Sequence, residues 1–139
     1  MAFPKIDACI VCEDLRQEKA RKTTILGFFG LIPYVEISIR DFNQPLERLA
    51  FLLMGGPGEG TFSVALDLLD PSGKQILPLP LPTVQIPYVK SEKRSQFGFA
   101  IAPLKLTTSG EYKLRILVDG KPHYEAPFVA RQGKEEEFA

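Results

Sequence analysis

The chain of 139 residues is poor in the side chains that most metal and disulfide sites require, because it contains only two cysteines and one histidine. A secreted disulfide framework needs more cysteines than this, and a structural zinc site usually takes four cysteine or histidine ligands. We therefore expect no cofactor, no metal and a reducing, cytoplasmic setting. The alternative is a mature secreted domain that has lost its signal.

The chain also lacks an excess of charge of either sign, since seventeen basic residues offset seventeen acidic ones. Without a net field, nothing draws the protein towards nucleic acid or an anionic membrane. No apolar run approaches the roughly 18 residues that a membrane-spanning helix needs. Residues 1–7 show no basic stretch followed by an apolar one. We expect no nucleic-acid partner, no membrane and no secretory signal.

What the chain does have is a regular alternation of apolar and polar residues, which is clearest in 61–68, 97–102, 111–118 and 124–129. A period of two is typical of antiparallel strands that bury one face. Further strand candidates are 5–12, 23–29, 34–40, 48–54 and 83–89. Residues 45–54 also contain good helix formers, but the glycine-rich turn after them favours a strand in a hairpin with the next. The charged residues 14–22 predict a loop, with room for one helical turn.

The segment 106–120 resembles the tyrosine corner of immunoglobulin-like β-sandwiches, with Leu106 before a turn and Gly110 and Tyr112 opening a strand. In that motif the tyrosine hydroxyl bonds to backbone a few residues upstream while the ring packs inward. The sequence therefore predicts an all-β, immunoglobulin-like antiparallel β-sandwich of about seven to nine strands. We expect one domain over residues 1–131 and a charged, flexible tail over 132–139.

The order of strands and turns resembles a family of small uncharacterised bacterial proteins. Segments 8–14, 24–29, 70–73, 110–112 and 118–120 carry the resemblance, which covers roughly residues 5–131. It implies a compact β-sandwich and brings no established activity, cofactor or catalytic residue.

Three groups of residues suggest chemistry, and each has a simpler structural interpretation. Cys9 and Cys12 form a Cys-x-x-Cys pair, but they lie in an apolar strand rather than at a helix N-terminus, so we interpret them as structural thiols. His123 is interpreted as a surface residue near a turn. The glycines of 55–60 are followed by a strand rather than a helix, which favours a flexible hairpin connection over a phosphate loop.

A ligand-binding sandwich, for glycans or calcium, is the alternative function, using end loops such as 55–60, 70–74 and 119–123. Asp67, Asp70 and Asp119 could supply oxygens, but a calcium site takes six to eight, and turn formation explains the last two. The prolines of 78–82 are interpreted as an edge segment or connector rather than as a polyproline ligand. Two mildly basic loops are interpreted as solvated; they contain Arg16, Lys19, Arg21 and Lys22 in one case and Lys90, Lys93 and Arg94 in the other.

The apolar stretch 25–35 is the strongest functional signal. Consecutive phenylalanines in a strand send one ring to each face, so either a loop covers the outer ring or the surface there is adhesive. An exposed patch with Phe28, Leu31 and Tyr34 would mark a protein–protein contact. We predict a non-enzymatic interaction or assembly module that contacts either a second copy of itself or an unidentified protein partner. Hydrolase or redox activity is the third candidate function, after the interaction module and the ligand-binding sandwich.

Overall fold

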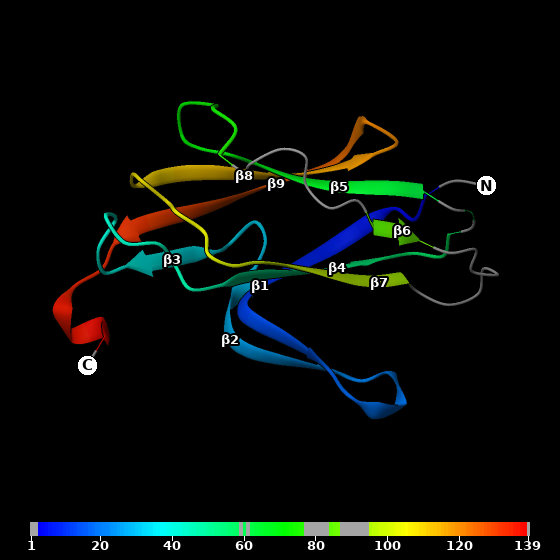
Figure 1. Ribbon diagram of the computed structural model, residues 1–139, viewed down its shortest axis with the longest axis horizontal. Coiled ribbons are helices and arrows are strands. Elements are labelled where there is room, and N and C mark those ends of the chain that lie inside the picture. Colours follow the sequence, from blue (N-terminus) through cyan, green and yellow to red (C-terminus); the bar gives the residue numbers. More distant parts are fainter. Residues whose placement is uncertain (1–2, 59, 61, 77–83, 87–94, 139) are drawn as a thin grey trace.

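The computed structural model describes residues 3–58, 60, 62–76, 84–86 and 95–138, and it shows two stacked β-sheets (Figure 1). The first sheet has the order β2 (Thr23–Leu31), β1 (Ile6–Gln17), β4 (Leu49–Gly55) and β7 (Ser95–Ile101). The second has the order β3 (Glu36–Ile39), β9 (Lys121–Gln132), β8 (Gly110–Val118), β5 (Phe62–Leu69) and β6 (Val84–Ile86). Neighbouring strands are antiparallel except β3 and β9, which are parallel. The predicted all-β sandwich is therefore confirmed.

The core lies between the sheets and is built from the inward positions of the alternating strands. Phe51 of β4 meets Phe128 of β9 across the layers, with ring centroids 6.0 Å apart. Fully burying a side chain of this size contributes about 1.5–3 kcal/mol relative to leaving it exposed. Other fully buried members are Val11, Leu53, Val64, Leu68, Leu114 and Ile116. In the described residues, no helix is long and apolar enough to cross a membrane.

The start of β8 is fixed by Tyr112. Its hydroxyl donates a hydrogen bond to the carbonyl oxygen of Thr108 (2.7 Å) and accepts one from the same residue's amide (3.3 Å). The ring is fully buried and stacks on Phe128 at 5.6 Å. Leu106 is buried beside the core, and Gly110 has a φ of 138°, which favours glycine. These contacts hold the turn before β8 against the sandwich.

Two predictions about connections are wrong. Strands β4 and β5 do not form a hairpin, because β4 pairs with β1 and β7 in one sheet while β5 pairs with β6 and β8 in the other. Both edges of β4 are already occupied, so the glycine-rich connection crosses between the layers. The loop expected over 14–22 is wrong for its first four residues, because β1 continues to Gln17, whereas Lys19–Arg21 forms the single helical turn that was allowed there.

The ends of β1 and β2 form a projecting arm, which we define as residues 13–31. The pairing of β1 with β2 shifts between Val11 and Cys12, and beyond this point β1 leaves β4. In Figure 1 the arm extends below the first sheet as a partial third layer. Leu15 Cδ1 lies 2.6 Å from where a Cβ on Gly98 of β7 would stand. The side-chain nitrogen of Gln96, Nε2, also donates a hydrogen bond to Thr23 Oγ1 at 3.0 Å. The arm therefore rests on the outer face of the first sheet.

The C-terminal residues fold back on β3. Glu137, in a 3-10 turn (Glu135–Phe138), accepts two hydrogen bonds from the guanidinium of Arg131 (3.0 and 2.9 Å) and one from the Ser38 hydroxyl (2.6 Å). These contacts, that of Arg131 first, lower the pKa of Glu137 to about 2. Arg40 lies over the ring of Phe138, 4.9 Å from its centroid. The flexibility expected for 132–139 stays a prediction.

Candidate functional site

The arm and the turn that follows it expose an apolar surface that we call the arm surface, consisting of Ile25, Leu26, Phe28, Leu31 and Tyr34. Among the residues whose side chains the structure describes, six large hydrophobic side chains are exposed, and these five are among them. Phe28 is 62% exposed and Tyr34 is 90% exposed. The sixth, Val129, lies apart in β9. Exposed apolar side chains scattered singly are ordinary, but five within ten residues concentrate apolar surface in one segment, as contact sites do.

The two phenylalanines of β2 are divided between the core and the solvent. Phe29 is half-buried and packs against the core, whereas Phe28 points outwards. Of the two interpretations that the sequence left open, the described residues therefore favour the exposed ring.

The backbone of β2 adds a second feature to the arm surface. This strand is at the edge of its sheet, and no described strand pairs with its outer side. Natural edge strands are usually protected by charged residues or proline, because their free N–H and C=O groups can pair with another chain. Residues 23–31 contain neither a charged residue nor proline. These two kinds of protection are therefore missing from the edge.

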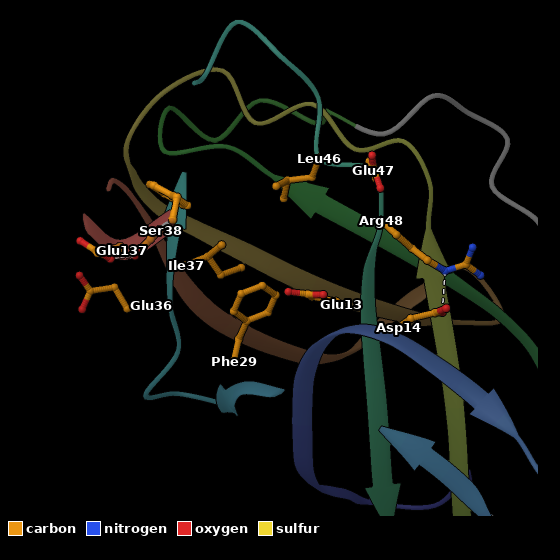
Figure 2. A pocket seen from close by; sticks show the side chains of 11 residues that line it. Glu13, Asp14, Phe29, Glu36, Ile37, Ser38, Leu46, Glu47, Arg48 and Glu137 are labelled. Carbon is orange, nitrogen blue, oxygen red and sulfur yellow. Dashed lines mark hydrogen bonds and ion pairs between the residues drawn. The ribbon is translucent and has the colours of Figure 1, made fainter. Parts of the chain in front are cut away.

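A groove of about 650 Å³ lies beside the base of the arm (Figure 2). Its apolar lining comes from Phe29, Ile37, Leu46 and Phe138. Its carboxylates come from four separate parts of the chain: Glu13 and Asp14 from β1, Glu36 from β3, Glu47 before β4, and Glu137 from the C-terminal turn. Sequence reasoning missed this cluster because the acids are far apart along the chain.

Three of the five carboxylates in the groove have an ion-pair partner, and these three share two arginines. Asp14 forms an ion pair with Arg48 at 2.6 Å, and Glu36 forms one with Arg131, which also binds the carboxylate of Glu137. In the described part of the chain, Glu13 and Glu47 have no ion-pair partner, so the groove retains negative charge. Among residues 3–58, 60, 62–76, 84–86 and 95–138, no group of three histidine, cysteine or acidic residues could hold a metal ion.

Comparison with known families gives a match to a family of unknown function, DUF6941, over residues 7–131. This range runs from the start of β1 almost to the end of β9. The chain belongs to DUF6941. The resemblance to a family of uncharacterised proteins is thereby confirmed. No curated protein matches the chain.

The thiols of this DUF6941 chain are free and buried. Burial, followed by the proximity of Cys12, raises the pKa of Cys9 to about 12. Burial also raises the pKa of Cys12, whose Sγ donates weakly to the Asp14 carbonyl at 3.4 Å. Both thiols are therefore protonated near neutral pH, whereas a reactive cysteine needs its thiolate form. This supports their interpretation as structural residues.

His123 of the DUF6941 domain is exposed, and its partners are structural. Nε2 lies 3.2 Å from the carbonyl oxygen of Pro4, and the ring packs edge-on against Phe3 with centroids 4.8 Å apart. The contact holds the N-terminal segment against β9.

The three aspartates considered for calcium are engaged within the fold. Asp67 is buried rather than facing solvent, and it forms an ion pair with Arg115 at 2.6 Å. Asp70 Oδ1 accepts hydrogen bonds from Ser72 and from the amide of Lys74, which closes a turn and lowers the pKa of Asp70. Asp119 Oδ1 accepts from the amide of Ser63 at 3.1 Å, and Asp119 with Gly120 forms the turn between β8 and β9. These aspartates hold turns and strands together.

Several predicted features of the DUF6941 chain lie outside the described residues. They are the prolines of 78–82 and the basic residues Lys90, Lys93 and Arg94.

Proposed function

We propose that this chain is a protein-interaction or assembly module without catalytic function, and that it contacts its partner through the arm surface. A bacterial, cytoplasmic setting is part of the proposal and is supported by the two free thiols. The observation that carries the proposal is the concentration of exposed apolar side chains in residues 25–34.

The energetics favour the arm surface as a contact site. Fully burying an exposed side chain of the size of Phe28 or Leu31 contributes about 1.5–3 kcal/mol. Aromatic residues such as Tyr34 are enriched at the energetic centres of interfaces. The free edge of β2 would add main-chain hydrogen bonds, as in partners that extend an existing sheet. Together these terms favour association through the arm surface.

The test is co-purification from an extract of the source cells, with an untagged copy of the chain expressed beside the tagged one. The wild type is compared with the double variant Phe28→Glu, Leu31→Glu. Val129→Glu is the matched control, because it places the same charge on an exposed apolar residue outside the arm. We expect the wild type and the control to retain a bound protein, and the double variant to lose at least about nine-tenths of it. Equal recovery by all three, or recovery of nothing by the wild type, would contradict the proposal.

A further inference from the structure

We propose that the occupant of the arm surface is a second copy of this chain, whose β2 pairs antiparallel with the first β2 about a two-fold axis. This inference rests on the proposed function and identifies its partner. It follows from two properties of the arm: an edge strand that can pair with itself, and a distribution of charge along the arm that an inverted copy complements.

The first property is the self-complementarity of β2. A two-fold interface places the same patch of both subunits together, so the patch must match itself. Residues 23–31 are themselves uncharged, so the residues that lie directly opposite each other in two paired β2 strands include no like-charge pair. Antiparallel pairing satisfies the free backbone groups on the outer edge of each β2. With the axis at Gly27, the central residue of β2, it also sets Leu26 of each copy against Phe28 of the other.

The second property is the opposite charge of the two ends of the arm. The tip, residues 16–22, contains four basic residues and one acid. Lys19 and Lys22 are exposed there. The other end lies beside the groove, where Glu13 and Glu47 have no ion-pair partner in the described residues.

An inverted copy resolves this asymmetry. In an antiparallel pair, the tip of one arm lies beside the end of the other β2 that contains Leu31. Phe29, near that end, lines the groove. Each basic tip then approaches the acidic groove of the other copy, and the two-fold axis forms this contact twice. Such complementary charge sets the orientation of an interface more than its affinity.

The first experiment measures mass in solution by sedimentation equilibrium and light scattering across the micromolar range. We expect a species of twice the 15.5 kDa of the chain. Phe28→Glu is expected to weaken the dimer at least tenfold, because it places two charges in the buried centre of the interface. Val129→Glu is expected to leave the dimer unchanged. A chain that is monomeric at every concentration would overturn the inference, and so would a dimer that survives Phe28→Glu.

The second experiment tests the orientation by charge exchange. Lys22→Glu alone and Glu47→Lys alone should each weaken the dimer severalfold at low salt, whereas the double variant should recover most of the loss. Neither residue has an ion pair in the described residues, so the exchange breaks no internal contact of this kind. Lys121→Glu, on the exposed first residue of β9, is the control. If the double variant loses as much dimer stability as the two single variants lose together, the antiparallel arrangement is overturned.

The two proposals fail in different ways. If the chain is monomeric but binds a different protein that the arm variant loses, the second copy is excluded while the interaction module stands. If neither a dimer nor an arm-dependent partner is found, both are contradicted.

Discussion

Replacing Tyr112 by phenylalanine tests whether the hydroxyl of this tyrosine fastens the turn before β8. The substitution keeps the buried ring and its stacking on Phe128 and removes only the hydroxyl. Two hydrogen bonds to Thr108 are lost, one short at 2.7 Å and one long at 3.3 Å. Because Thr108 is exposed, water can replace part of what is lost. We therefore expect the free energy of unfolding to fall by about 1–2 kcal/mol.

The assay is unfolding in urea and by heat, followed by far-ultraviolet circular dichroism, since the chain has no tryptophan. For a chain of this size the expected loss corresponds to a fall in Tm of about 3–8 °C. The slope of the urea transition should not change, because the surface exposed on unfolding is the same. Tyr34→Phe is the matched control: Tyr34 is 90% exposed, and its loss of a hydroxyl should leave Tm unchanged. Equal stability of the two variants would refute the reasoning.

Three further predictions concern close packing, the thiols and the C-terminal turn. Gly55→Ala places a Cβ 2.5 Å from the backbone oxygen of Lys5 and should destabilise the fold by about 1–3 kcal/mol in urea unfolding. Gly56→Ala meets nothing within 4 Å, and an equal loss there would show that the close approach is not the cause. Cys9 should resist thiol reagents at neutral pH in the native state and react fully after unfolding, because its pKa is about 12; rapid native labelling would contradict this. The carboxylate of Glu137, with its pKa lowered from 4.5 to about 2, contributes stability that is fully present above pH 4.5 and is lost as the pH falls through about 2. An NMR titration midpoint for Glu137 near 4.5 would show that the turn is not held in solution.

The local parts of the fold could be predicted from the sequence because they depend on neighbouring residues. The alternation in 111–118 predicts a strand with one face towards a core, and the structure confirms it as β8 at 110–118. The Asp119–Gly120 pair indicates a tight turn because both residues have positive φ there. The division of Phe28 and Phe29 between two faces follows from the two-residue repeat of any strand.

The partners of each strand could not be predicted in the same way. The glycine-rich connection after β4 has the composition of a hairpin loop, yet it joins the two sheets because β1 and β7 already occupy both edges of β4. Asp67 occupies an alternating outward position but is buried against Arg115 of β8, a neighbour 48 residues away. Such contacts depend on strands that lie far apart in the chain.

By itself, the sequence determined that this protein is a β-sandwich, where its turns fall and that residues 25–35 carry more apolar surface than a one-sided core can bury. Side-chain alternation and turn chemistry are properties of adjacent residues, so they can be recognised without knowledge of any long-range contact. Only the tertiary structure decided that β2 is an edge strand, that the arm leaves β4 after Cys12 and that carboxylates from four segments share one groove. Those features arise from pairing between distant strands, where the free energy of the whole packed assembly, rather than local preference, selects the arrangement.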